Sequence, residues 1–168
     1  NSSILTGTIV YDLIPLINPG PYLKDKRVRH WYETKIKHLR RSDIVLAISE
    51  SSRGEVIDYL GFDQGDVINV STAVDAEHYQ GEVDHDYTNT LRRSLGLDRD
   101  VVLYTGGIDH RKNIDGLITA YAGLCPALRD THQLVIVCSI QPGERQRLEA
   151  HAKAAGLRAN DLKLTGYV

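Results

Sequence analysis

Two glycines and two cations occur close together, Gly106-Gly107 and Arg111-Lys112, and their spacing suits the binding of a diphosphate. Arginine can hold two phosphate oxygens in a fork, and lysine adds a compact positive charge. The glycines let the backbone turn because no Cβ stands in the way. The residues predict a site that neutralises a diphosphate, including one that must leave during a reaction. The alternative is a tight strand-to-helix turn whose cations are solvated.

The flanking residues predict a strand before this turn and a helix after it. Residues 101–103 are β-formers that suit a parallel strand buried on both faces. Asn113 is a preferred N-cap residue, so a helix beginning there would direct its unpaired N–H groups and positive dipole end toward the glycines. Asp109 would repel phosphate, and we therefore expect it to orient Arg111 or the glycine turn. His110 is expected to be exposed.

Strands and helices alternate along the chain, which predicts an α/β fold with parallel sheets and helical crossovers. Pro15, Pro19 and Pro21 predict a loop after the first strand. Residues 71–100 show weaker periodicity, apart from a short helical stretch near residues 91–95, and predict a connection between two units. The expected strands are residues 4–11, 43–48, 67–70, 101–105, 133–139 and 162–165, and the expected helices are residues 24–41, 49–60, 113–124 and 142–155.

Two other strand ends carry candidate residues. Ser139 leaves the expected strand 133–139, and nucleotides bind at the carboxyl ends of parallel strands. An ordinary strand end with a buried Cys138 is the favoured alternative. Asp12 follows the first strand, where acceptor-facing groups of a cleft would lie. Asx-type bonds that hold the proline loop are the simpler explanation for Asp12.

The second expected helix has its own start signals. Ser49 begins it, and Ser52 and Glu55 have the spacing of a capping box. Gly61 is the expected stop. These residues have a structural explanation, so a function for them is not required.

Residues 106–121, which read Gly-Gly-Ile-Asp-His-Arg-Lys-Asn and Ile-Asp-Gly-Leu-Ile-Thr-Ala-Tyr, resemble the donor-phosphate turn of group 1 retaining glycosyltransferases of the GT-B architecture. Residues 11–17, 41–52 and 67–75 resemble, in the same order, the second half of that family's first domain. The resemblance covers nearly the whole chain. It implies α/β parts of two Rossmann-like parallel-sheet domains: the second half of the acceptor-side domain at residues 1–75, an inter-domain connection at 76–100, and the first half of the nucleotide-sugar donor domain at 101–168.

The resemblance also implies roles for individual residues. Arg111 and Lys112 would stabilise the departing nucleotide diphosphate, and Asp12 would lie on the acceptor side. Tyr11 stands where some members of the family have His, so a proton acceptor is missing there. From the residues alone, Tyr167 would merely cap the sheet edge. The implied donor-binding residues are Gly106, Gly107, Asn113, Ser139, Gly166, Tyr167 and Val168.

The reaction that the resemblance implies is sugar transfer from a nucleotide diphosphate sugar to a carbohydrate or lipid-linked acceptor. Configuration would be retained, as in a hexosyltransferase of the mannosyltransferase kind in polysaccharide biosynthesis, with no cofactor and no metal ion. The family's paired glutamates, which contact the donor, would follow Val168, and the chain contains no Met. We therefore expect a fragment that is inactive alone. A non-catalytic nucleotide- or anion-binding α/β module is the alternative, whereas a dinucleotide oxidoreductase is disfavoured because G-x-G-x-x-G is missing.

Composition excludes several other classes of protein. Charged residues make up 25% and hydrophobic residues 42% of the 168 residues, which is ordinary for a globular protein. The formal net charge of −2 gives no reason to expect nucleic acid. Cys125 and Cys138 lack the spacing of a zinc site. Because no apolar run reaches the ~18 residues of a membrane-spanning helix and no signal peptide is visible, a cytoplasmic location is expected.

Residues 24–41 predict an unusually basic helix that also carries Trp31 and Tyr32. Such a face could contact anionic lipid headgroups at the inner face of a membrane, or a phosphate-bearing acceptor. The alternative is a solvated helix face whose aromatic side chains are buried in the core. We favour this second interpretation, because interfacial helices need exposed aromatic residues.

Overall fold

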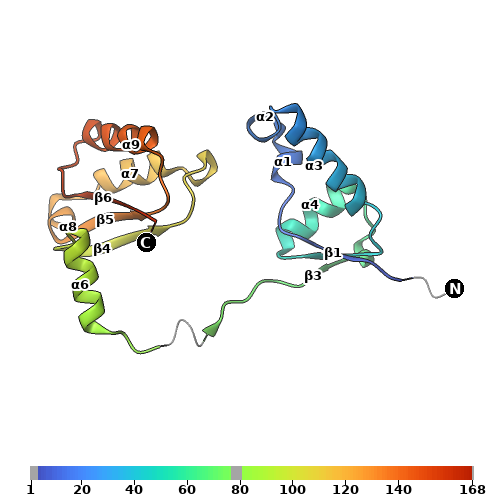
Figure 1. The fold of residues 1–168 in the computed structure, drawn as a ribbon, viewed down its shortest axis with the longest axis horizontal. Helices are drawn as coiled ribbons and strands as arrows, with labels where there is room; N and C mark the ends of the chain where they lie inside the picture. Colours follow the sequence, from blue (N-terminus) through green and yellow to red (C-terminus); the bar gives the residue numbers. More distant parts are fainter. Residues whose placement is uncertain (1–3, 77–80, 168) are drawn as a thin grey trace. The chain divides into compact units, whose positions relative to one another are not determined.

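The computed structural model describes residues 4–76 and 81–167 of the chain. The chain divides into two compact units, residues 1–80 and residues 81–168. Each unit contains a three-stranded parallel sheet with helices between its strands (Figure 1). This arrangement agrees with the predicted alternation of strands and helices.

The sheet of the first unit has the strand order β1-β2-β3. Each crossover between neighbouring strands contains one long helix, and both helices pack on the same face of the sheet (Figure 1). The elements are β1 (Gly7–Val10), α1 (Ile14–Ile17), α2 (Pro19–Tyr22), α3 (Lys26–Leu39), β2 (Ile44–Ala47), α4 (Glu50–Leu60), the 3-10 helix η1 (Gln64–Asp66) and β3 (Val67–Asn69).

The proline-rich segment after β1 is not the loop that the sequence predicts. It forms the two single-turn helices α1 and α2. Pro15 and Pro19 stand in the first turns of these helices. A proline is tolerated there because its missing N–H would have no partner within the helix. Prolines therefore begin short helices here instead of preventing them.

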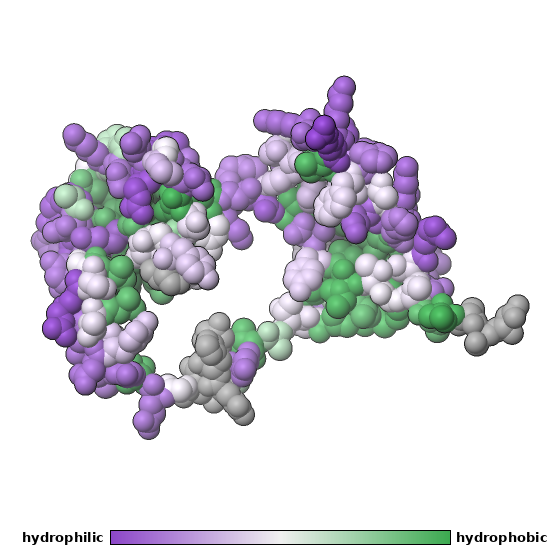
Figure 2. Space-filling view, viewed as in Figure 1, coloured by the Kyte–Doolittle hydropathy of each residue, from purple (hydrophilic) through white to green (hydrophobic). Residues whose placement is uncertain are grey.

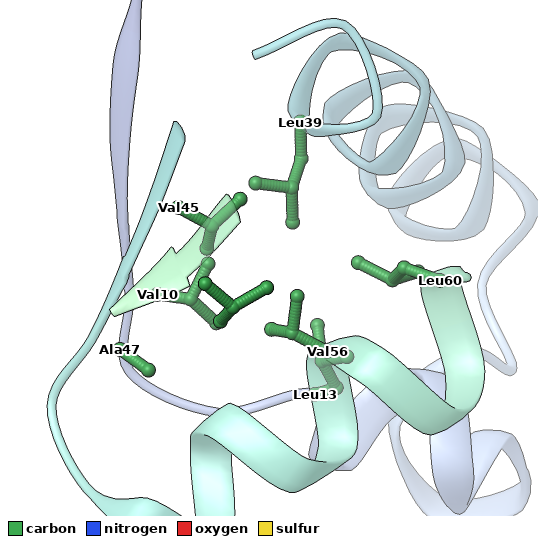
Figure 3. Close-up of a cluster of buried hydrophobic side chains, with 8 residues drawn as sticks. Val10, Leu13, Leu39, Val45, Ala47, Val56 and Leu60 are labelled. Atoms are coloured by element: carbon green, nitrogen blue, oxygen red, sulfur yellow. The ribbon is translucent and has the colours of Figure 1, made fainter. Parts of the chain in front are cut away.

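The core of the first unit forms where α3 and α4 meet the sheet. Figure 3 shows the buried side chains of both helices directed toward those of the strands. The cluster consists of Val10, Leu13, Leu39, Val45, Ala47, Val56, Leu60 and Val67. On the opposite face of the sheet, Ile9 and Ile68 are exposed, and Figure 2 shows hydrophobic residues over these strands. Apolar residues on both faces are typical of parallel strands.

The start of α4 differs from the expected capping box. Ser49 is the N-cap, and its hydroxyl accepts a hydrogen bond from the Ser52 N–H at 3.1 Å. The Ser52 hydroxyl donates to the Tyr11 carbonyl at 2.6 Å, and Glu55 accepts from the Leu13 N–H at 3.1 Å. Ser52 and Glu55 thus tie α4 to the segment after β1, a long-range role that local spacing does not indicate.

The α3 helix corrects another expectation. Tyr32 is partly buried, but Trp31 is 60% exposed. Neighbouring helical residues point about 100° apart, so the two adjacent aromatic side chains lie on different parts of the helix surface. Burial in the core is therefore wrong for Trp31.

The second unit repeats the parallel arrangement with strand order β4-β5-β6. Helices α7 and α9 pack on one face of this sheet and share a core with it. Helix α6 lies in this unit, inside the range predicted as the connection. The elements are α6 (His85–Leu95), β4 (Asp100–Thr105), the 3-10 helix η2 (His110–Lys112), α7 (Ile114–Ala122), α8 (Pro126–Thr131), β5 (His132–Val137), α9 (Pro142–Ala154) and β6 (Leu162–Gly166).

A buried polar network fixes the edge of this sheet at which the strands begin. Gln133 accepts hydrogen bonds from the backbone N–H groups of Asp98 and Arg99. The Asp161 carboxylate, fully buried, accepts from the Arg158 backbone and side chain and from the Arg99 guanidinium. Burial alone would raise the pKa of Asp161, but these bonds outweigh it and hold the pKa at about 2. The ionised carboxylate is thus part of the folded structure.

We predict that Asp161→Asn lowers the free energy of unfolding by at least about 2 kcal/mol, because it leaves Arg99 without its buried counter-charge. Asp161 has a lowered pKa in the folded chain, so its contribution is present above pH 3.8 and is lost as the pH falls toward 2. Urea unfolding at neutral and acidic pH measures both effects.

The matched control is Asp130→Asn. Asp130 pairs with Arg158 at 2.7 Å, but both side chains are more than half exposed. An exposed ion pair contributes about 0 to 1 kcal/mol. Equal losses of unfolding free energy for Asp130→Asn and Asp161→Asn would show that burial of the carboxylate does not decide how much its ion pair contributes to stability.

Candidate functional site

The three strands of the second sheet end side by side. Thr105 pairs with Val137, and Val137 pairs with Gly166. Because the strands are parallel, the segments that follow them leave from the same edge of the sheet. This edge brings together five predicted donor residues, Gly106, Gly107, Ser139, Gly166 and Tyr167. Val168 lies outside the described residues.

The glycine turn has a conformation that requires glycine at its first position. Gly106 has a φ of +139°, which L side chains rarely adopt, and a Cβ there would lie 3.2 Å from the Tyr104 hydroxyl. That hydroxyl donates a hydrogen bond to the Gly107 carbonyl at 2.6 Å. A Cβ on Gly107 would meet no atom within 4 Å. The Tyr104 side chain of β4 thus holds the turn, whereas the space beside Gly107 is open.

The loop then forms η2 before the helix begins. Asn113 is the N-cap of α7, as predicted, and its Oδ1 accepts from the Gly116 N–H at 3.2 Å. Its backbone is left-handed, with φ 49° and ψ 48°. Asparagine tolerates this conformation better than most residues. The single turn of η2, which the sequence does not predict, places Arg111 and Lys112 immediately before the α7 N-terminus.

Asp109 holds Arg111, which is one of the two roles that the sequence predicts for it. Its Oδ1 accepts from the Arg111 backbone N–H at 3.1 Å and from Nε at 2.8 Å. The same oxygen lies 3.5 Å from His110 Nδ1, and His110 is exposed as expected. Lys112 is exposed, and its side chain makes no ion pair within residues 4–76 and 81–167. The arginine is therefore positioned by a carboxylate, whereas the lysine extends into solvent.

A cavity of about 460 Å³ lies between this loop and the start of α9. Arg147 lines it and forms ion pairs with Asp115 at 2.8 Å and Glu144 at 2.7 Å. Hydrogen bonds from Arg147 hold the pKa of Glu144 below its usual value. Arg111 and Lys112 do not line the cavity, and Asp109, Asp115 and Glu144 do. These carboxylates make the cavity a poor place for a diphosphate.

Arg147 is the residue that sequence reasoning missed. Its i,i+3 spacing from Glu144 is readable as a helix-surface pair. Its ion pair with Asp115 joins two helices. Because the two residues are 32 positions apart in the sequence, only the fold reveals this pair. Arg147 thereby fixes the start of α9 against the start of α7.

Asp12 lies in the first unit, after β1. Its Oδ1 accepts from the Ile14 N–H at 3.0 Å, which confirms the Asx-type interpretation. This bond helps to begin α1. Nothing in the contacts of Asp12 assigns it to an acceptor, and that role stays a prediction.

The described parts of the chain hold no group of three or more His, Cys, Asp or Glu residues placed to bind a metal ion. Among the helices in these parts, none has both the length and the apolar character needed to cross a bilayer.

Comparison with known proteins shows which family part of the chain resembles. The family model described as glycosyl transferases group 1 matches residues 88–168. These residues are similar to the group 1 glycosyl transferases. The chain is also 32% identical over 163 residues to the serotype-specific mannosyltransferase WbdA of Escherichia coli, an alignment that covers 97% of this chain and 20% of WbdA. The chain thus spans about a fifth of the length of the curated relatives that it matches.

Solved structures support the same fold. HepE of Anabaena in complex with UDP-glucose is 18% identical, with a TM-score of 0.70 over 96% of this chain and 42% of HepE. WaaG, a glycosyltransferase involved in lipopolysaccharide biosynthesis, is 15% identical, with a TM-score of 0.68 over 98% of this chain and 46% of WaaG. With the two parallel sheets, these likenesses confirm the predicted α/β fold class of the GT-B type.

We predict that Asn113→Ala lowers the free energy of unfolding by about 2 kcal/mol, since it removes the cap and strains the left-handed backbone. Asn113→Gly should lower the free energy of unfolding by less than about 1 kcal/mol, because glycine adopts this conformation freely and is a tolerated N-cap. Chemical denaturation of both variants measures the difference. Equal losses would contradict the left-handed conformation of residue 113.

Proposed function

We propose that the second unit binds a nucleotide diphosphate sugar, with the diphosphate above the Gly106-Gly107 turn. One observation carries this proposal: the glycine turn, the two cations and the start of α7 occupy a single loop at the edge where three parallel strands end. Ligands of open α/β sheets bind outside the carboxyl ends of the strands. The exposed loop leaves room for an anion there.

In this proposal Arg111 and Lys112 supply the countercharge for the diphosphate. Charge grows on the leaving group during sugar transfer, and fixed cations at that point lower the barrier effectively. Asp109 is a positioning residue, because its bond to Arg111 Nε restricts the guanidinium. Asn113 starts α7 and directs the positive end of the helix dipole toward the loop. Two cations at this point could provide the positive charge without a metal ion.

The neighbouring strand ends would hold the rest of the donor. We propose that backbone groups of Gly166, Tyr167 and Val168 contact the nucleobase, and that Ser139 lies near the nucleoside. Tyr167 is 91% exposed, so its ring is free of core packing and can take part in binding. The structure of HepE with UDP-glucose supports a nucleotide sugar as the donor class.

For the whole protein we propose transfer to a carbohydrate or lipid-linked acceptor with retention of configuration, in polysaccharide biosynthesis. The support is the relation to WbdA, a serotype-specific mannosyltransferase, which favours a mannosyl donor. Residues 1–75 would belong to the acceptor side, with Asp12 as the candidate residue. Residues 76–100 would connect them to the donor side at residues 101–168.

Calorimetric titration with UDP, GDP and uridine tests the donor site. We predict that Arg111→Ala and Lys112→Ala each weaken diphosphate binding by about 10- to 100-fold, since hydrogen bonds to charged groups contribute about 1.5–3 kcal/mol. Uridine, which carries no phosphate, should bind each variant as it binds the parent chain.

The matched control is Arg93→Ala, which removes an exposed cation of α6. It should leave the affinity for UDP and GDP unchanged. Equal weakening by Arg93→Ala, or unchanged affinity after Arg111→Ala and Lys112→Ala, would remove the diphosphate from this loop.

Sugar transfer by the chain itself is a separate measurement. We expect donor binding without transfer from a panel of nucleotide sugars, because the chain spans about a fifth of the length of its mannosyltransferase relatives. Robust transfer by residues 1–168 would refute that expectation while leaving the proposed donor site intact.

A further inference from the structure

The starts of α7 and α9 line one cavity and stand next to two candidate ligand segments. Asp115 is the second residue of α7, directly after the loop that carries Arg111 and Lys112. Glu144 is the third residue of α9, which begins three positions after Ser139. The two helices share a core on one face of the sheet (Figure 1). A contact between the helix starts therefore bears on the distance between the two segments.

Arg147 joins the two helix starts through a single guanidinium group. Its Nη1 donates to both carboxylate oxygens of Asp115, at 2.9 and 2.8 Å. Its Nε and Nη2 donate to the Glu144 carboxylate, at 3.1 and 2.7 Å. A guanidinium can hold two carboxylates at once because its N–H donors point in fixed directions. Lysine cannot reproduce this arrangement, since it carries a compact ammonium group on a flexible chain.

The start of α9 lacks the side-chain cap that fixes the start of α7. Asn113 caps α7 by accepting from the Gly116 N–H, whereas Gln141, the N-cap of α9, makes no capping bond with its side chain. Glu144 lies in the first turn of α9. By holding Glu144 against α7, Arg147 supplies the attachment that the cap does not.

The two helices stay packed without Arg147. Ile118 of α7 and Leu148 of α9 are fully buried in the shared core. His151 provides a second polar link, because its Nε2 lies 3.1 Å from the Asp115 carbonyl oxygen. The side chains of Arg147 and Asp115 are about half exposed, and exposed ion pairs contribute little to stability. Arg147 therefore affects the placement of the helix starts more than the stability of the fold.

We propose that Arg147 is a positioning residue that sets the distance between the diphosphate and nucleoside parts of the donor site. This inference rests on the proposed function, in which the loop after β4 holds the diphosphate and the ends of β5 and β6 hold the nucleoside. A nucleoside diphosphate contacts both parts at once, so its affinity depends on their separation. Uridine or pyrophosphate contacts one part only. Because two carboxylates engage the guanidinium, Arg147 acts through the helices and not by binding the ligand.

Titration of the isotope-labelled chain with UDP, uridine and inorganic pyrophosphate tests the proposal, since amide chemical shifts report weak binding as well as tight binding. Arg147→Lys keeps the positive charge but loses the two-sided grip. It should weaken UDP binding by about 10-fold, because two linked contacts strengthen binding only when both are reached together. Uridine and pyrophosphate should bind this variant as they bind the parent chain. A merely structural role would lower stability without changing UDP affinity relative to the two fragments.

Asp115→Asn distinguishes positioning from a simple effect of charge. Removing a carboxylate near the diphosphate would tighten UDP binding if charge alone mattered. We expect UDP binding to weaken by about threefold instead, because a neutral amide holds Arg147 less firmly than a carboxylate does. The double variant Asp115→Asn, Arg147→Lys should bind UDP no more weakly than Arg147→Lys alone, since both changes remove the same link.

The matched control is Arg145→Lys, the same substitution on the same helix. Arg145 pairs at 3.7 Å with Glu149, which also belongs to α9, so this pair does not join α9 to α7. Arg145→Lys should leave the affinities for UDP, uridine and pyrophosphate unchanged. Circular dichroism verifies that each variant is folded.

Hydrogen exchange without nucleotide separates this inference from the donor site itself. Arg147→Lys should speed amide exchange in residues 106–113 and 138–141, whereas Arg145→Lys should not. If the parent chain does not bind UDP, the donor site is refuted, and the exchange rates still decide whether Arg147 links the two segments.

Three outcomes would overturn the proposal. One is unchanged exchange in both segments of Arg147→Lys. Another is tighter UDP binding by Asp115→Asn, which would reduce the network to a charge effect. The third is equal weakening of UDP and pyrophosphate binding by Arg147→Lys, which would place the guanidinium in direct contact with the phosphates.

Discussion

The parallel register of β4, β5 and β6 is the constraint on which the candidate site depends. Thr105, Val137 and Gly166 stand side by side, so three loops that are far apart in sequence begin at one edge. Hydrogen bonding between strands sets this register, and the core beneath α7 and α9 maintains it. At the other end of the same strands, Gln133 and Asp161 fix the backbone through buried polar bonds. Buried polar bonds thus fix the edge at which the strands begin, while the edge at which they end carries the candidate ligand site.

The loop after β4 shows how a conformation that few residues tolerate can position charge. Gly106 and Asn113 both have positive φ values. A hydrogen bond holds the backbone next to each of them: the Tyr104 hydroxyl donates to the Gly107 carbonyl, and the Asn113 side chain accepts from the Gly116 N–H. Between them, Asp109 restricts Arg111. Electrostatic stabilisation is most effective when the charges are already in place, because no reorganisation is then needed. The loop meets that requirement for Arg111, and Lys112 extends freely beside it.

The two sides of α3 differ in their exposure to solvent. Its inner side joins the core through Leu39 and Ile36. Its outer side leaves Trp31 exposed among cations, although burial of a tryptophan would bring a large gain of free energy. The prediction that Trp31 and Tyr32 are both buried follows this energetic argument and is correct only for Tyr32. Adjacent helical residues point about 100° apart, and here Tyr32 is turned toward the core while Trp31 is not.

The sequence by itself determined the α/β class and the strand-turn-helix around Gly106 and Asn113, and it limited Asp109 to orienting either Arg111 or the glycine turn. These features depend on neighbours within a few positions, which local propensity and charge spacing describe. Only the tertiary structure decided the alignment of the three strand ends, the links from Ser52 and Glu55 to the segment after β1, and the Arg147–Asp115 pair. Such contacts join residues 29 or more positions apart, and no local pattern specifies which of many compatible side chains will meet. Short elements such as α1, α2 and α8 also escaped prediction, because four to six residues are too few to show a period and packing stabilises them instead.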